Sequence, residues 1–176
     1  MSINHWIVKN LVCTLLLAVG GLNMYAQKDK YLIEAEAFQF KGKWSTDRSA
    51  DCMGSAMLRL NGGGSLDEQF DALTVVNIME EGDYNVWVRS ADYDKLPGTR
   101  LFRLSVDEKP MKESGKHGKV GFYWENAGCV QLAKKQVLLR LHDTKRNFGR
   151  CDAILLVKDH SINPNEMDRK EVGKWR

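Results

Sequence analysis

Apolar and polar residues alternate with a period of two along most of the chain, which is the pattern of β-strands with one buried face. In "GDYNVWVRS" (82–90), for example, Tyr84, Val86 and Val88 fall on one side. No long apolar stripe recurs with the 3.6-residue period of an amphipathic helix. The other predicted strands are 31–38, 56–60, 72–79, 100–108, 129–133, 136–143 and 151–159. The last of these is almost continuously apolar, as expected of a central strand.

Turn-forming residues separate these strands, in "NGGG", "EEGD", "LPGT", "DEKP" and "NFGR". Short strands separated by turns at a spacing of about ten residues are typical of an antiparallel sandwich or barrel. The sequence therefore predicts an all-β fold, a jelly-roll β-sandwich.

The first 26 residues differ from the rest and have the features of a secretory signal peptide. "MSINHWIVKN" carries one lysine and no acid, "LVCTLLLAVGGL" is apolar, and Ala26 offers a small residue for cleavage. The apolar run is too short to span a bilayer comfortably. We expect residues 1–26 to be removed, and the remainder to be exported to the periplasm or beyond without membrane insertion.

Residues 27–159 are expected to form the sandwich. The following segment, "HSINPNEMDRKEVGKWR", shows no apolar face, so 160–176 is predicted to be a polar tail or linker. The formal net charge of the whole chain is +3. No basic cluster accompanies it, which argues against a nucleic-acid partner.

Three cysteines, Cys52, Cys129 and Cys151, follow the predicted signal peptide. An odd number permits at most one internal disulfide, and the absence of a C-x-x-C pair argues against a zinc site. A buried apolar role is expected for these thiols.

Two carboxylates, Glu34 and Glu36, interrupt the apolar run "YLIEAEAFQF". In a strand they would lie on one face, about 7 Å apart, and burying them without a positive partner would be costly. An arginine, a lysine or a calcium ion would satisfy them, whereas on a solvated edge strand they need no partner. If the first and last strands are neighbours, Asp152 joins the same group.

Four segments in order resemble a known family: "IEAEAF", "GDYNVWVRSADY", "VGFYWENAGCVQLAKKQVLLRLHD" and "GRCDAILLVKD". This order is similar to that of carbohydrate-binding modules of families 6 and 35, which have the galactose-binding-like jelly roll. The resemblance covers 31–159 and extends to N-terminal modules of secreted, multidomain bacterial enzymes. It implies that Glu34, Glu36 and Asp152 hold a structural calcium ion. Cys151 and "AKKQ" depart from the family pattern.

Sugar binding requires an aromatic face for the C–H side of a pyranose and polar groups for its hydroxyls. Trp124 matches the family's aromatic strand, and Asn147 matches its loop asparagine. Trp87, Tyr93 and Arg146 complete the predicted binding residues. Further aromatic candidates are Trp44, Tyr123 and Phe148, and for each aromatic residue core packing is the alternative. Arg146 and Arg150 flank Asn147 and would either grip an acidic sugar or lie on a solvated loop.

Motifs of nucleophilic catalysis and of nucleotide binding are missing from the sequence. The expected function is therefore non-catalytic recognition of a polysaccharide or oligosaccharide. The alternative is a structural or protein-interaction module that serves a partner domain, either polysaccharide-degrading or oxidoreductase.

Overall fold

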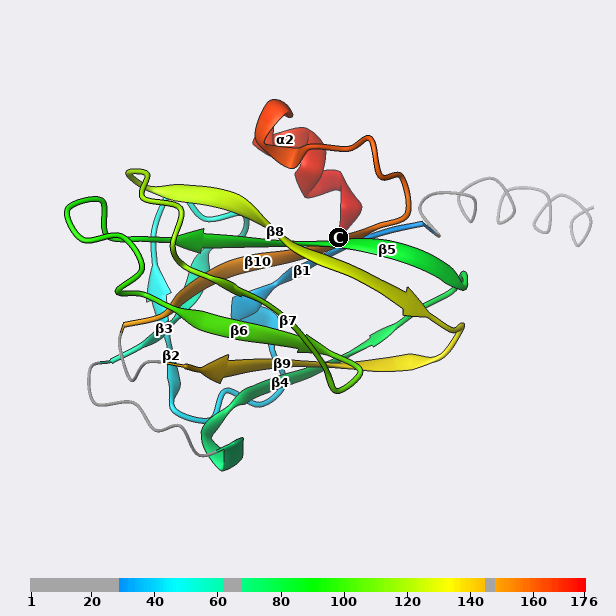
Figure 1. Cartoon of the computed structure of the whole chain (residues 1–176), viewed down its shortest axis with the longest axis horizontal. Coiled ribbons are helices and arrows are strands. Elements are labelled where there is room, and N and C mark those ends of the chain that lie inside the picture. The colour runs from blue at the N-terminus through cyan, green and yellow to red at the C-terminus, as the bar shows by residue number, and fades with distance from the viewer. Residues whose placement is uncertain (1–28, 62–67, 145–147) are drawn as a thin grey trace, which may run out of the picture.

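The computed structural model describes residues 29–61, 68–144 and 148–176. These residues form two antiparallel β-sheets packed face to face, which confirms the predicted β-sandwich (Figure 1). The predicted signal peptide lies outside the described residues. Within the described ranges, no helix is long and apolar enough to cross a membrane.

The larger sheet has the order β2-β3-β10-β5-β8, and β1 also pairs with β10. Because β5 occupies one side of β10, β1 and β3 share the other side, at different positions along it. The first and last strands are therefore neighbours, as the sequence predicts. The strand bounds in this sheet are β1 Lys30–Glu34, β2 Trp44–Arg48, β3 Ala56–Leu60, β5 Gly82–Ala91, β8 Phe122–Leu132 and β10 Arg150–Val157.

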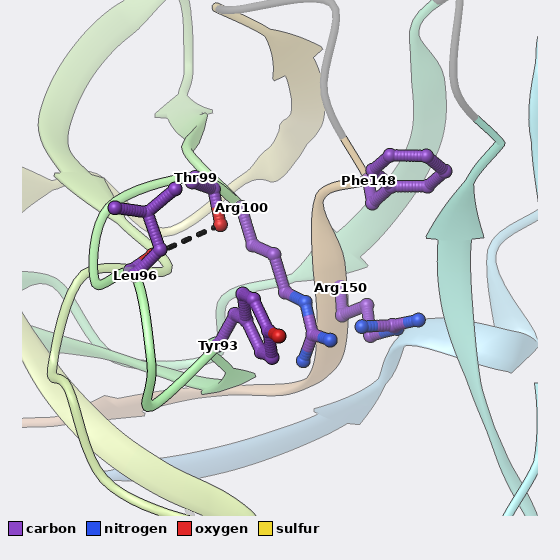
Figure 2. Close-up of a pocket in the computed structure, with 6 residues that line it drawn as sticks. All are labelled: Tyr93, Leu96, Thr99, Arg100, Phe148 and Arg150. Atoms are coloured by element: carbon purple, nitrogen blue, oxygen red, sulfur yellow. Dashed lines mark hydrogen bonds between the residues drawn. The ribbon is translucent and has the colours of Figure 1, made fainter.

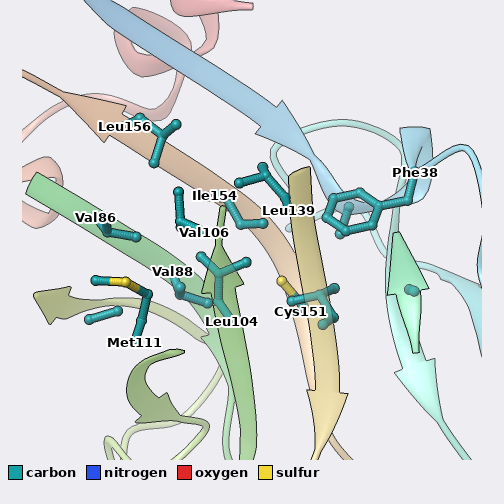
Figure 3. Close-up of a cluster of buried hydrophobic side chains, with 14 of the residues drawn as sticks. Phe38, Val86, Val88, Leu104, Val106, Met111, Leu139, Cys151, Ile154 and Leu156 are labelled. Atoms are coloured by element: carbon teal, nitrogen blue, oxygen red, sulfur yellow. The ribbon is translucent and has the colours of Figure 1, made fainter. Parts of the chain in front are cut away.

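The smaller sheet has the order β4-β9-β6-β7, and its bounds are β4 Ala72–Asn77, β6 Phe102–Val106, β7 Lys109–Ser114 and β9 Gln136–Asp143. Alternate residues of both sheets meet in one core, part of which Figure 3 shows. Tyr84, Val86 and Val88 are fully buried there, as their spacing predicts.

Several strands differ from their predicted bounds. Strand β1 ends at Glu34, because a 3₁₀ turn, η1 (Ala35–Ala37), follows it. Strands β2 and β7 were not predicted. Alternation indicated only the second half of β8, whereas the family resemblance placed Trp124 of its first half on a strand. A tight turn through Asp107 and Glu108, both with positive φ, joins β6 to β7.

The prediction of a polar tail after Asp159 is wrong for the described structure. Residues 160–176 form two 3₁₀ turns, η3 (Pro164–Glu166) and η4 (Gly173–Trp175), and one helical turn, α2 (Arg169–Val172). They pack on the outer face of the larger sheet, above β8 and β5 in Figure 1. Val172 is buried against that face. We name residues 160–176 the C-terminal cover.

Candidate functional site

The three predicted metal ligands lie around one short segment, Cys52–Ala56. Pairing of β1 with β10 places Glu34 opposite Ala153, next to Asp152. The side chains of Glu34 and Glu36 both approach Gly54 so closely that a Cβ atom there would lie 2.2 Å from Glu36 Oε1. The three acids therefore lie around the same segment.

Each of these carboxylates already receives N–H donors. The backbone N of Met53 lies 3.1 Å from both oxygens of Asp152, and Asp152 Oδ2 also contacts the Arg89 guanidinium. Glu36 Oε1 accepts hydrogen bonds from the N–H groups of Ser55 and Ala56. The last charged contact comes from the C-terminal cover, where Arg176 Nε donates to Glu34 Oε1.

This donor arrangement does not fit a calcium ion. Calcium takes six to eight oxygen ligands, whereas N–H groups occupy at least one oxygen of each carboxylate. Among the described residues, no group of three His, Cys, Asp or Glu side chains is placed to hold a metal. The positive charge beside the acids comes instead from Arg89 and Arg176. Calcium binding therefore stays a prediction of the family resemblance, and this donor arrangement argues against it.

Burial dominates the electrostatics of this cluster. The side chain of Asp152 has no exposed surface, and its burial raises its pKa even though Arg89 acts in the opposite direction. Burial and the neighbouring Asp152 raise the pKa of the Cys52 thiol to about 12. Cys52 and Cys151 are buried as predicted, whereas Cys129 is exposed, and all three are free thiols.

The two tryptophans predicted to stack on sugar lie beneath the C-terminal cover. Trp124 is only 5% exposed, and its backbone N–H and C=O both hydrogen-bond to the side chain of Asn165. Trp87 packs against the same buried cluster. Trp124 lines a small cavity of about 190 Å³ beside the cover but exposes little of its ring, so sugar stacking on Trp124 stays a prediction. Of the other predicted binding residues, Asn147 and Arg146 lie outside the described residues.

Tyr93 does line a cavity, of about 450 Å³, at the end of the sandwich where β5 finishes. One wall is the loop between β5 and β6, and the other is the segment leading into β10 (Figure 2). We name this cavity the loop pocket. Its lining residues are Tyr93, Leu96, Thr99, Arg100, Phe148 and Arg150.

A buried carboxylate shapes the first wall. Asp92, 4% exposed, accepts hydrogen bonds from the backbone N–H groups of Tyr93, Gly98 and Gly118. Its own carbonyl accepts a 2.6 Å hydrogen bond from Arg100. These contacts fix the loop at both its ends, so the wall is organised before any ligand arrives.

The position of the second wall is set by Gly149, which lies close to the core. A Cβ atom at Gly149 would lie 3.3 Å from Trp44, Leu60 and Phe102. The carbonyl of Gly149 also accepts a hydrogen bond from the N–H of Leu60. Gly149 therefore anchors its neighbours Phe148 and Arg150 to the core. Phe148 remains 51% exposed although it adjoins this anchor.

The loop pocket brings together guanidinium groups from distant parts of the chain. Burial lowers the pKa of Arg100, and burial together with Arg100 and Arg59 lowers the pKa of Arg150. Arg59 has an ion-pair partner, Asp47, at 3.2 Å. Within the described ranges, no carboxylate forms an ion pair with Arg100 or Arg150.

Sequence analysis identified Tyr93, Phe148 and Arg150 as candidates but missed Arg100. A usable signal was present, because Arg100 follows Tyr93 on the same turn-rich segment, "DYDKLPGTR". The sequence did not show that this segment faces the start of β10.

Neither a family model nor a curated protein matches the chain. Solved structures do match it. A GH26-CBM35 β-(1,4)-mannanase from Podospora anserina aligns with a TM-score of 0.61 at 18% identity, over 79% of this chain and 31% of that one.

Two isolated modules align over nearly their whole length. A family 35 carbohydrate-binding module from Clostridium thermocellum gives a TM-score of 0.58 at 19% identity, over 72% of this chain and 97% of that one. The C-terminal CBM6 of LamC, a marine laminarinase from Zobellia galactanivorans, gives a TM-score of 0.57 at 16% identity, over 74% of this chain and 100% of that one. The chain therefore has the jelly-roll β-sandwich fold of family 35 and family 6 carbohydrate-binding modules.

Proposed function

We propose that this protein is a carbohydrate-binding module and that the loop pocket is its binding site. The observation that carries the proposal is the presence of exposed rings and polar side chains in one cavity. Tyr93 and Phe148 are 41% and 51% exposed there, beside the guanidinium groups of Arg100 and Arg150. Exposed aromatic faces and a few fixed donors are what a saccharide requires.

The open face of Phe148 is the better stacking platform in this arrangement. One face of the Tyr93 ring is already approached by the Arg100 guanidinium, at 5.5 Å from the ring centroid. We therefore assign stacking to Phe148, and orientation of the hydroxyl groups to the hydroxyl of Thr99 and the guanidinium groups. Thr99 is held in place by a 3.0 Å hydrogen bond to the carbonyl of Leu96.

The proposed role is binding without cleavage. Glycoside hydrolysis by the common mechanisms needs two carboxyl groups that flank the scissile bond. The described lining of the loop pocket contributes aromatic, aliphatic, hydroxyl and guanidinium groups. Export is part of the same proposal, with residues 1–26 as the signal peptide. So is an accessory role beside a partner enzyme or domain.

Affinity electrophoresis of the purified chain through gels that contain plant, host or microbial polysaccharides tests this function. We expect retardation by at least one polysaccharide, and loss of most of it in Phe148→Ala. Phe40→Ala is the matched control, because Phe40 is 52% exposed and hydrogen-bonds through its backbone to Leu73 of β4, away from the loop pocket. Equal retardation of both variants would overturn the assignment of the site. Absence of retardation by every polysaccharide would favour a module that contacts a protein partner.

A further inference from the structure

Strand β4 lies at an edge of the smaller sheet, with β9 on one side of it (Figure 1). On its other side, Leu73 exchanges two backbone hydrogen bonds with Phe40, of 3.0 and 2.7 Å. Alternate residues of a strand direct their N–H and C=O groups to the same side, so Val75 and Asn77 also direct theirs away from β9. No described residue hydrogen-bonds to these groups. An open edge of this kind is a template for a further strand.

This edge is also hollowed and apolar. A groove of about 360 Å³, between β4 and β1, borders the open backbone groups of Val75 and Asn77. Seven large apolar side chains are exposed among the described residues, and Phe40, Val75 and Met79 are three of them. Three others line the loop pocket. We name Phe40 and Val75–Met79 the β4 edge. Apolar side chains gathered beside unpaired backbone indicate a binding surface.

The two ends of the β4 edge carry opposite charges. Lys43, three residues after Phe40, is exposed, and its Nζ lies over an aromatic ring, 3.7 Å from the centroid. At the other end, Glu81 and Asp83 follow Met79 and are exposed. In the described ranges, none of these three charged side chains forms an ion pair. If two such edges paired in antiparallel fashion, the positive end of each would meet the negative end of the other.

We propose that the β4 edge pairs with the β4 edge of a second copy of this chain, antiparallel about a twofold axis at Val76. In this register Val75 faces Asn77 of the second copy, and the two residues exchange N–H···O hydrogen bonds. The axis repeats the exchange with the copies reversed. Met79 of each copy then lies beside Phe40 of the other. Such an isologous interface closes at two copies.

Length and charge both favour a second copy over an unrelated extended partner. An unrelated strand that ran further along the edge would meet Phe40, which already bonds to Leu73. Strand β4 of a second copy ends at Asn77, so its paired stretch is as short as the open one. Glu81 of that copy lies beyond Phe40, on the side of Lys43. The interface is small, so we expect a dimer that dissociates readily.

Sedimentation velocity of the full chain, from about 10 μM to about 1 mM, measures this association. We expect a reversible monomer–dimer equilibrium for wild type. Val75→Pro removes an N–H that faces the free edge and keeps the bonds of β4 to β9. Because the axis removes this donor from both copies, dimerisation should weaken at least about 10-fold.

Val75→Lys is a second variant, because a lysine on an edge strand opposes pairing without changing the backbone. It should weaken dimerisation as Val75→Pro does. Val120→Lys is the matched control, since Val120 is 84% exposed and lies between β7 and β8, outside the β4 edge. It should dimerise like wild type.

Charge reversal tests the antiparallel arrangement. Lys43→Glu and Glu81→Lys should each dimerise more weakly than wild type, because like charges then meet at both ends of the interface. An equimolar mixture of the two variants should associate at least about 3-fold more tightly than either alone at low ionic strength. In the mixed dimer, opposite charges meet again at both ends.

Each outcome supports or overturns this inference, which does not rest on the proposed function. A wild-type chain that stays monomeric at about 1 mM overturns it and leaves carbohydrate binding intact. Equal association of wild type and both Val75 variants also overturns it, because the contact then lies elsewhere. A mixture that associates no better than its components overturns the antiparallel arrangement. Thermal melts identify any loss that comes from unfolding, and the charge-reversal variants, at exposed positions, test the inference independently of Val75→Pro.

Discussion

The guanidinium of Arg89, on β5, contacts the carboxylate of Asp152, on the neighbouring strand β10, beneath the loop that carries Met53. The Asp152 side chain has no exposed surface, whereas that of Arg89 keeps 12%. Arg89 also donates to the carbonyl of Asp51. Removing Arg89 therefore leaves Asp152 buried without a counter-charge, whereas removing Asp152 leaves Arg89 with partial exposure and the Asp51 carbonyl.

Replacing Arg89 should be far more destabilising than replacing Asp152. Arg89→Gln leaves a buried carboxylate without its counter-charge, which typically costs about 3–5 kcal/mol. Asp152→Asn leaves an arginine that still reaches solvent and the Asp51 carbonyl, so we expect a smaller loss. Urea unfolding measures both free energies of unfolding.

Arg103→Gln serves as the control, because Arg103 pairs with Glu113 at the surface and its loss should cost no more than about 1 kcal/mol. If Arg89→Gln costs no more than this control, the buried pair does not stabilise the fold as described.

The same carboxyl group predicts a pH dependence. Burial raises the pKa of Asp152 above its ordinary value of 3.8. A carboxyl whose pKa is higher in the folded than in the unfolded state favours folding more strongly as the pH falls through the raised pKa toward 3.8. The free energy of unfolding of wild type, minus that of Asp152→Asn, should therefore grow as the pH is lowered from neutral. Urea titrations across this range check the sign. A difference that shrinks on acidification would mean that Arg89 outweighs burial.

Calcium should have no effect on the thermal midpoint of the wild-type chain. A ligand that binds only the folded state must raise stability, and N–H donors already occupy oxygens of Glu34, Glu36 and Asp152. Melts in chelator and in excess calcium should coincide, with magnesium at equal ionic strength as the control. A higher midpoint in calcium alone would restore the metal site predicted from the family resemblance.

The C-terminal cover should contribute to stability through its apolar contacts. Val172 is 1% exposed and packs with Leu155, Trp124 and other residues of the outer face. Val172→Ala should lower the free energy of unfolding by about 1.5–3 kcal/mol. Glu171→Ala, at an exposed position of the same helical turn, should change it by less than about 0.5 kcal/mol. Equal effects in urea unfolding would mean that the cover is a tail, as first predicted.

The sequence predicted the strands that alternate clearly in polarity or form a short apolar run between turns. The bounds of β3 and β9 match their predictions, because β3 is a short apolar run that ends at turn residues and β9 alternates. Strands β2 and β7 were not predicted, because "WSTDR" and "KPMKES" are mostly polar and lie at sheet edges. There only some residues face the core, so hydrophobic alternation is weak.

The positions of candidate site residues were predictable where they depend on the order of the strands. Glu34, Glu36 and Asp152 converge because the end strands pair, but the sequence does not show that Arg89 and Arg176 reach them. The burial of Trp124 was not predicted, because it depends on isolated apolar residues of the cover, such as Val172. The approach of Arg100 to Arg150 depends on loop geometry that hydrophobic patterning does not encode.

The location of the binding site is tested most directly by titrating the ¹⁵N-labelled chain with the saccharide that retards it most and mapping the amide shifts. We predict that the largest shifts fall on Leu96–Arg100 and Phe148–Arg150, the two walls of the loop pocket, while Trp124 and Asn165 stay unchanged. Shifts centred on Trp124 and Asn165 would place the ligand beneath the C-terminal cover and contradict the account.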